Sequence, residues 1–247
     1  MIRRILLSIV MLLVISYLIV AVTAFNVKPP HQVCRDIDLV IKDSVNAGFI
    51  TKKEVTSILT RKKAFPIGKK TEEIDLNVLE GILGAHPLID RVECYKTPAG
   101  KVYVEVTQRV PVLRVMAANG ENYYIDNKGI VMPPEAKCVA HLPIATGNVE
   151  KSFALTDLYQ FALFLQKNAF WNAQIEQINV RTGREVELVP RVGDHIVFLG
   201  KMNGYENKLN RLKEFYRKGL NKVGWNKYKR ISVEFDNQII CTKKEDG

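Results

Sequence analysis

Several sequence signatures of catalysis are missing from this chain of 247 residues. There is no HExxH pattern of a zinc protease, no GxSxG nucleophile elbow and no GxxxxGK[ST] phosphate-binding loop. None of the four histidines lies near a cysteine at zinc-ligand spacing, and no CxxC pair occurs. We therefore expect no catalytic residue, no cofactor, no metal ion and no small-molecule substrate.

Low-complexity tracts, collagen-like or heptad periods and clear internal repeats are also missing, which argues against fibrous and repeat architectures. Cysteine is scarce, with four residues at positions 34, 94, 138 and 241. Their even number permits disulfides in an oxidising compartment, and the sequence does not choose among the three possible pairings. We expect most of them to be buried thiols that fill core space.

Charge is missing altogether from residues 5–25, which read ILLSIVMLLVISYLIVAVTAF. As a helix this run spans about 31 Å, close to the hydrocarbon thickness of a bilayer. Arg3 and Arg4 precede it, and the positive-inside rule places that end in the cytoplasm. The sequence predicts a single-pass anchor at residues 5–25, a cytoplasmic end at residues 1–4 and an exported remainder.

A cleaved signal peptide is the alternative for the same run. Its basic region would be Arg3 and Arg4, and Val22, Thr23 and Ala24 resemble a small-residue cleavage site. The apolar run is longer than the roughly 7–15 residues of signal peptides, which favours the uncleaved anchor. Both interpretations export the rest of the chain.

The formal net charge is +10, and ten Lys or Arg residues gather in residues 201–230 against Glu206 and Glu214. Such a cluster is either a solvated helix face or a surface for acidic proteins, lipid headgroups or cell-wall polymer. Export to the outer side of a membrane argues against nucleic acid as the partner.

Residues 33–110, which follow a short linker at 26–32, predict a small α+β domain. Thr51 and Glu54 form a capping-box pattern, and Asp75 is a second candidate helix cap. Residues 101–109 alternate apolar and polar side chains, as a half-buried strand does. The expected order is strand 33–42, the two capped helices, strand 88–96 and strand 101–109. Both helices would cover one face of a three-stranded sheet.

Residues 111–247 predict a larger mixed β-sheet with two helices. The expected helices are residues 153–170 and a final one that opens at Asn203 or Gly204 and ends by Gly219 or Gly224. The expected strands are residues 112–116, 123–125, 130–132, 142–147, 175–180, 185–189, 195–199 and 230–242.

The run HPLIDRVECYKTPAGKVYVEVTQRVPVLRV resembles a polypeptide-transport-associated (POTRA) domain. In that pattern a P-x-[IV]-x-x-[VA] strand leads through a turn to L-x-V-x-V-x-E-[RK]-x-P. Most of it is filled here, by Val102, Val104, Val106, Arg109 and Pro111. Gln108 stands where an acidic residue is common.

Two later runs extend the resemblance over nearly the whole chain. YYIDNKGIVMP is followed by KLNRLKEFYRK and RISVEFDNQIIC, and this order behind one anchor resembles the FtsQ/DivIB family of bacterial cell-division proteins. Ser232 and Glu234 depart from the family's usual Asp and Arg in the last strand.

The resemblance implies a non-catalytic scaffold of the division complex in the inner membrane, required for septum formation, with its C-terminal domain in the periplasm at the division site. Its implied partner is the small subunit FtsB, joined to FtsL. An edge strand over residues 231–240 would bind a partner strand by β-augmentation. The predicted contact strand comprises Phe235, Asp236, Asn237, Gln238, Ile239 and Ile240. A basic helix beside it, with Lys208, Arg211, Arg217 and Lys218, would attract acidic side chains.

Three other interpretations stay open. The last strand could be an ordinary core strand without a partner. The chain could be a POTRA-bearing component of protein export or outer-membrane assembly, which predicts a large domain of long alternating strands for which 247 residues leave no room. An exported cell-wall enzyme predicts activity that is lost on one polar substitution, and the sequence offers no candidate residue.

Overall fold

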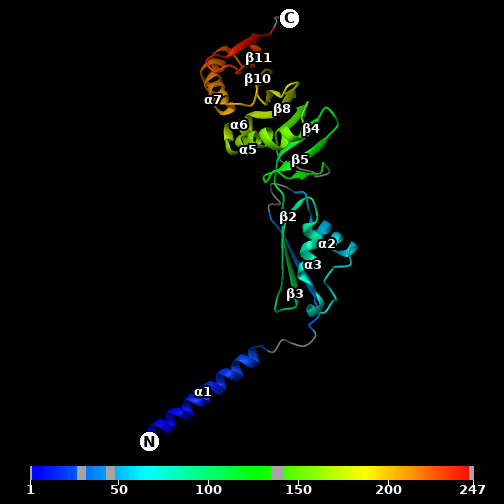
Figure 1. Cartoon of the computed structure of the whole chain (residues 1–247), viewed down its shortest axis with the longest axis vertical. Helices are drawn as coiled ribbons and strands as arrows, with labels where there is room; N and C mark the ends of the chain where they lie inside the picture. Colours follow the sequence, from blue (N-terminus) through cyan, green and yellow to red (C-terminus); the bar gives the residue numbers. More distant parts are fainter. Residues whose placement is uncertain (1, 27–31, 43–47, 135–141, 245–247) are drawn as a thin grey trace.

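The computed structural model describes residues 2–26, 32–42, 48–134 and 142–244 of the chain. Along its longest axis the molecule runs from helix α1 through a small domain, residues 32–110, to a large domain, residues 111–244 (Figure 1). The small domain carries two helices on a three-stranded sheet, and the large domain is built on a nine-stranded sheet. The predicted α+β class is confirmed.

Helix α1, Ile2–Asn26, covers the apolar run at the N-terminus. The side chains that the structure describes on it extend from residue 7 to residue 23. Within the described part of the chain, no helix combines the length and the apolar content of a membrane span.

The sheet of the small domain has the order β1-β3-β2. Strand β1, Asp36–Lys42, runs parallel to β3, Lys101–Gln108, and β3 pairs antiparallel with β2, Ile89–Lys96. Helices α2, Lys52–Arg61, and α3, Leu76–Gly84, lie together on one side of this sheet (Figure 1). The predicted strand–helix–helix–strand–strand order is therefore confirmed.

Local chemistry explains where these two helices begin. The Thr51 hydroxyl accepts the Glu54 amide at 3.2 Å, and the Glu54 carboxylate accepts the Thr51 amide at 2.7 Å. The Asp75 carboxylate accepts the Asn77 amide at 2.9 Å and starts α3. Each cap satisfies backbone donors that a helix N-terminus otherwise leaves free.

The alternation in β3 sends one set of side chains into the core. Val102, Val104 and Val106 are fully buried beneath the two helices, while their neighbours in the strand are partly exposed. Burying a valine is worth about 1.5–3 kcal/mol. These three valines are the centre of the small domain's core.

The large sheet has the order β12-β11-β10-β9-β8-β7-β4-β5-β6. Its strands are β4 Pro111–Ala117, β5 Asn122–Asp126, β6 Val131–Met132, β7 Ile144–Gly147, β8 Ile175–Arg181, β9 Glu185–Pro190, β10 Ile196–Gly200, β11 Tyr228–Ser232 and β12 Ile240–Lys243. Strand β7 runs parallel to β4 and β8, and β10 runs parallel to β11, whereas the other neighbours are antiparallel.

The predicted helix over residues 153–170 is wrong at its C-terminal end. A helix starts with α4, Lys151–Phe153, continues through a π-helical turn η2, Ala154–Leu158, and ends with α5, Tyr159–Lys167. Asn168 then leaves the helical conformation, and its side chain accepts the Trp171 amide at 3.3 Å to cap α6, Ala169–Gln174. The helical spacing of apolar residues runs past Asn168, which is why the prediction continued to residue 170. Asn168 ends α5 because its side chain caps the next helix instead.

The second helical segment comprises α7, Tyr205–Phe215, a π-helical turn η3, Tyr216–Leu220, and α8, Asn221–Val223. It ends at Gly224, whose φ is +95°, and Gly219 lies inside it. Helices α5, α6 and α7 lie on the same side of the strands in Figure 1 and share one core with the sheet.

An ion pair between a partly buried arginine and a fully buried carboxylate joins the two domains. Arg109 follows β3 of the small domain, and its Nη1 donates to Asp126 of β5 at 2.8 Å. Asp126 is fully buried and also accepts the amides of Lys128 and Ile130 at 2.9 and 2.7 Å. On the surface beside it, Lys128 bonds Asp90 of β2 at 2.7 Å. The junction is therefore held by side chains from both domains.

Apolar contacts reinforce this junction. Tyr124 of β5 and Met132 of β6 are buried in the core of the small domain, and the Tyr124 ring lies 6.4 Å from that of Phe49. The buried Gln108 side chain accepts the amides of Phe49 and Ile50 at 2.8 and 2.9 Å, which fixes the chain just before α2.

The described cysteines are free thiols. Cys34 is buried, and Cys94 and Cys241 are half-buried. Burial, together with the Glu80 carboxylate, raises the pKa of Cys94 to about 12, and burial also raises the pKa of Cys241. No disulfide joins these three residues, and Cys138 lies outside the described residues.

Candidate partner-binding edge

Strand β12 forms one end of the large sheet. It pairs antiparallel with β11, with Ser232 opposite Ile240 and Ile231 opposite Cys241. Its other side has no neighbouring strand among the described residues. The backbone N–H and C=O groups on that side are therefore open to a further strand.

The predicted continuous strand over residues 230–242 is wrong. The structure has two short strands, β11 and β12, joined by a connection over residues 233–239. Of the six predicted contact residues, only Ile240 lies in β12. The other five lie in the connection: Phe235, Asp236, Asn237, Gln238 and Ile239. The Asp236-Asn237 pair forms the turn, as these residue types commonly do.

Two apolar side chains are exposed at this end of the sheet. Phe235, in the connection, is 51% exposed, and Ile240, at the start of β12, is 47% exposed. Ile239 and Cys241 instead pack against the large core. The edge thus offers both free backbone groups and apolar surface.

Arg211 of α7 holds the connection in place. Its Nη2 donates to the carbonyl oxygens of Val233 and Phe235 at 3.0 and 2.9 Å, and its Nη1 lies 3.7 Å from the Asp236 carboxylate. We predicted this side chain as a contact for an acidic partner. In the structure its guanidinium bonds the backbone of the chain itself.

Lys208 is also directed inward, one turn earlier in α7. The residue is only 4% exposed, and its Nζ donates to the carbonyl oxygens of Lys201 and Leu199 at 2.8 and 3.2 Å. Burial lowers the pKa of the Lys208 ammonium, although the carboxylates of Glu234 and Asp236 act in the opposite direction. The buried side chain does not belong to the exposed basic surface that we predicted.

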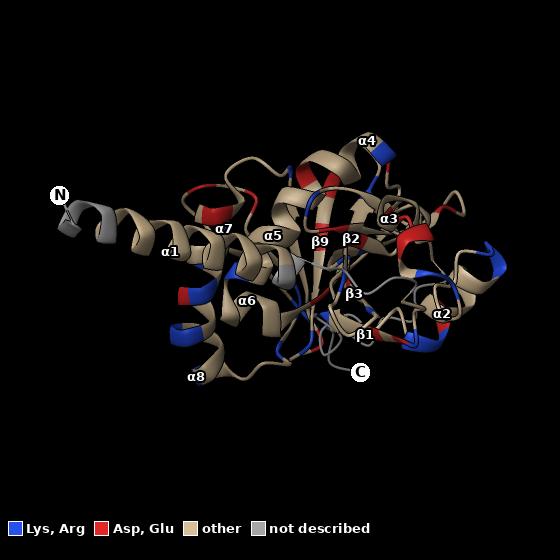
Figure 2. Ribbon diagram, turned by 90° about the horizontal axis from the view of Figure 1, so that it is seen from below, with Lys and Arg blue, Asp and Glu red and all other residues tan. Residues whose placement is uncertain are grey.

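The other two predicted cations are exposed. Arg217 and Lys218 lie in η3 and contact the Glu214 carboxylate at 3.3 and 2.8 Å. Exposed pairs of this kind contribute about 0–1 kcal/mol. Figure 2 shows blue segments along α7 and α8, the inward-directed Lys208 and Arg211 of α7 among the residues so coloured.

A polar network crosses the sheet beside this edge. Arg230 of β11 lies with its guanidinium carbon 4.2 Å from the centre of the Phe198 ring and 3.5 Å from the Glu187 carboxylate. Glu187 also accepts the Asn179 side chain at 3.2 Å. These contacts connect β8, β9 and β11 across the sheet and order the face next to β12.

A buried histidine–tyrosine pair went unnoticed in the sequence. His195 Nε2 lies 2.7 Å from the Tyr216 hydroxyl, which joins the start of β10 to η3. Burial lowers the pKa of His195 and raises that of Tyr216. His195 is only 1% exposed, so the pair is placed to support packing and not to meet a substrate.

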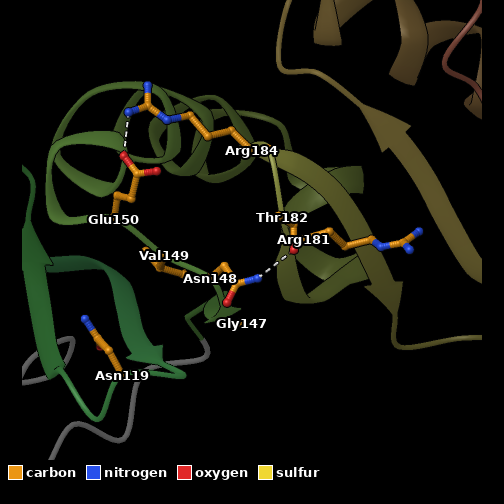
Figure 3. Close-up of a pocket in the computed structure, with 9 residues that line it drawn as sticks. Asn119, Gly147, Asn148, Val149, Glu150, Arg181, Thr182 and Arg184 are labelled. Atoms are coloured by element: carbon orange, nitrogen blue, oxygen red, sulfur yellow. Dashed lines mark hydrogen bonds and ion pairs between the residues drawn. The ribbon is translucent and has the colours of Figure 1, made fainter.

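One crevice lies where the parallel strands β4, β7 and β8 end (Figure 3). Its volume is about 280 Å³. Gly147 has a φ of +84°, and a Cβ there would lie 2.3 Å from the Val180 carbonyl oxygen. The dashed lines in Figure 3 join Arg184 to Glu150 and Asn148 to Thr182, so the loops bond each other.

The described residues contain no cluster of His, Cys, Asp and Glu that could hold a metal ion. Both ends of the large sheet, β12 and β6, lack a further neighbouring strand among the described residues. The β12 edge combines the longer of the two strands with the exposed side chains of Phe235 and Ile240. We therefore take it as the candidate site, and its chemistry is strand binding.

Two protein-family models match the chain. The first, described as FtsQ/DivIB, C-terminal related, matches residues 110–242, and the second, a POTRA-like domain, matches residues 32–107. A search of curated proteins finds no match. The first match covers more than half of the chain and contains the whole nine-stranded sheet except the last residue of β12. The second contains both helices of the small domain and nearly all of its sheet. The chain therefore belongs to the FtsQ/DivIB family.

Proposed function

We propose that the chain is a non-catalytic scaffold of the bacterial division complex and is required for septum formation. Family membership supports a role in division, and the free edge of β12 is the observation that carries the proposal of scaffolding by strand binding. The proposed place of the molecule is the division site, with both domains in the periplasm.

Helix α1 is the proposed single-pass anchor in the inner membrane, with its N-terminus in the cytoplasm. Successive helical residues are about 100° apart, so Leu12, Leu13, Val14 and Ile15 together point all round the axis. All four are apolar and at least 43% exposed. An all-round apolar helix is typical of a buried or membrane setting, and Arg3 and Arg4 favour the cytoplasmic N-terminus.

The proposed partner is an FtsB/FtsL-like subcomplex that adds a strand to β12. Main-chain hydrogen bonds would supply affinity, and side chains along the edge would supply specificity. Phe235 and Ile240 offer apolar contacts there, while Asp236, Asn237 and Gln238 border the added strand. Arg217 and Lys218 would attract an acidic partner and raise its rate of association.

Imaging an N-terminal fluorescent fusion in dividing cells tests the scaffold role. A band at the division site is the expected result. Uniform membrane signal throughout the cell cycle would contradict the role and favour the alternative of a protein-export component. Label released from the domains would show that residues 5–25 are a cleaved signal.

Proline substitutions test the strand contact. Backbone groups alternate along a strand, so one of Thr242 and Lys243 directs its N–H to the free edge. Of Thr242→Pro and Lys243→Pro, the variant that removes this outward N–H should weaken binding of the FtsB/FtsL-like subcomplex to the detergent-purified chain at least tenfold. Lys243→Ala keeps the N–H and is the matched control. Unchanged binding in both proline variants would rule out β-augmentation at β12.

A further inference from the structure

The loop after α2 is strongly basic. Residues 61–70 read RKKAFPIGKK and include Arg61, Lys62, Lys63, Lys69 and Lys70, with no acidic residue. All five basic side chains belong to exposed residues. Lys70 pairs with Glu73 at 3.4 Å, and the other four form no ion pair within the described residues. We call residues 61–70 the basic loop.

Hydrogen bonds attach the basic loop to the segment that follows α1. Cys34 donates its amide to the Lys69 carbonyl at 2.9 Å, and Gly68 donates its amide to the Cys34 carbonyl at 2.9 Å. Thr71 donates its amide to the Gln32 carbonyl at 2.8 Å. The loop is therefore fixed beside the first described residues of the small domain.

This attachment limits how far the basic loop can lie from α1. Helix α1 ends at Asn26, and a chain of six residues to Gln32 reaches at most about 20 Å. In Figure 1 the segment between α2 and α3 extends to the end of the small domain that faces α1. Figure 2, seen from that end, shows blue segments next to α2.

The middle of the basic loop is apolar. Ile67 is 43% exposed and lies between Lys63 and Lys69 in the sequence. Val33, which forms a β-bridge with Lys70, is also 43% exposed. Lysines that flank an exposed apolar residue are typical of surfaces that bind at the bilayer interface. There the apolar side chain enters the headgroup layer while the ammonium groups bind phosphates.

Acidic groups at this end of the domain do not cancel the charge. Asp36 bonds Lys101 at 2.9 Å, Glu73 pairs with Lys70, and Glu72 is exposed in the short helix η1, Thr71–Glu73. Arg35, whose amide bonds the Gly100 carbonyl at 3.1 Å, adds a further exposed cation. A basic excess therefore faces α1.

We infer that the basic loop binds anionic phospholipid headgroups on the outer face of the membrane. The inference rests on the proposed function, because it requires α1 to cross that membrane. Each lysine near an anionic surface strengthens such binding about fivefold at low ionic strength. The contact would fix the orientation of the small domain on the membrane.

Hydrogen exchange on the full chain in nanodiscs tests the inference. Peptides that cover residues 61–70 should exchange several-fold more slowly in discs with phosphatidylglycerol than in discs of phosphatidylcholine alone. The difference should disappear when Lys62, Lys63, Lys69 and Lys70 are all changed to Gln, and at high salt. The matched control changes Lys151, Lys167, Lys222 and Lys227 to Gln, removes the same charge from exposed sites of the large domain, and should keep the difference.

The outcomes separate the two proposals. Failure of the chain to enter discs of either composition would overturn the anchor and this inference together. Entry with equal exchange in both lipids, or equal slowing in both, would overturn this inference alone. Slowing that appears only after an FtsB/FtsL-like subcomplex is added would also overturn it, in favour of a protein partner.

Discussion

The basic clusters of the two domains contain side chains with opposite roles. In the large domain Lys208 and Arg211 point inward and bond backbone carbonyl oxygens. In the small domain Lys62 and Lys63 are exposed and form no ion pair within the described residues. Both clusters look alike as runs of charge in the sequence. The difference shows that clustered charge in the sequence does not tell which basic side chains the fold buries against backbone acceptors.

The largest loss of stability is expected at the junction between the domains, where the basic side chain of Arg109 pairs with a buried carboxylate. Arg109→Met leaves the fully buried Asp126 carboxylate without its charged partner. Removing one partner of a buried pair costs about 3–5 kcal/mol, and the two amides that Asp126 retains place the effect near about 3 kcal/mol. Urea denaturation of the detergent-purified chain measures it. Lys128→Ala, which removes an exposed contact, should cost under about 1 kcal/mol.

Lys208→Ala tests the inward side of the comparison. The substitution leaves the carbonyl oxygens of Leu199 and Lys201 without the ammonium and opens a cavity beneath α7. We expect a loss of about 2–3 kcal/mol in the free energy of unfolding. Lys222→Ala, at an exposed position of α8, is the control and should change stability by less than about 0.5 kcal/mol. Equal effects of the two substitutions would contradict the comparison.

Arg211→Ala should have a smaller effect on stability and a specific effect on the edge. Two backbone bonds to the connection over residues 233–239 are lost, which costs about 1–2 kcal/mol. Peptides from this connection should exchange amide hydrogens faster, and binding to the FtsB/FtsL-like subcomplex should weaken. Arg217→Ala should leave that exchange unchanged. A weaker complex without faster exchange would instead mean that Arg211 contacts the partner.

His195 sharpens the comparison, since it is another basic side chain that the large domain buries. Its folded pKa lies below the ordinary value of 6.5 because burial disfavours the imidazolium. The unfolded chain then binds the proton more readily, so stability is retained above about pH 6.5 and falls as the pH drops below it. His195→Gln should flatten this part of the stability profile. Burial also lowers the pKa of His86, which therefore contributes in the same direction.

Patterns within a few neighbouring residues predicted most of the fold, because helix caps and strand alternation act over short stretches of the chain. Thr51, Glu54 and Asp75 act on backbone groups within three positions, and Val102, Val104 and Val106 alternate with the strand. Each of these signals is complete within a short window of sequence. The helix starts and the small sheet could therefore be read without the structure.

The candidate edge was harder to predict. Ile231, Val233 and Phe235 continue an apolar alternation that concealed the turn, although Asp236-Asn237 was a signal for it. Lys208 lies three residues after Tyr205 and four before Leu212, so it shares the buried face of α7, and that spacing was a usable sign of burial. The Arg109–Asp126 pair left no local sign, because its partners come from two domains.

The firm junction at Asp126 has a consequence for which partners can be reached. The C-terminal end of the molecule, with β12, lies at the opposite end of its longest axis from α1 (Figure 1). In the proposed arrangement the two domains therefore hold the β12 edge at a fixed distance from the membrane surface. A partner anchored in the same membrane must present its strand at the same distance from the membrane surface. A partner whose segment outside the membrane is too short to reach β12 could not bind there, whatever its side chains are.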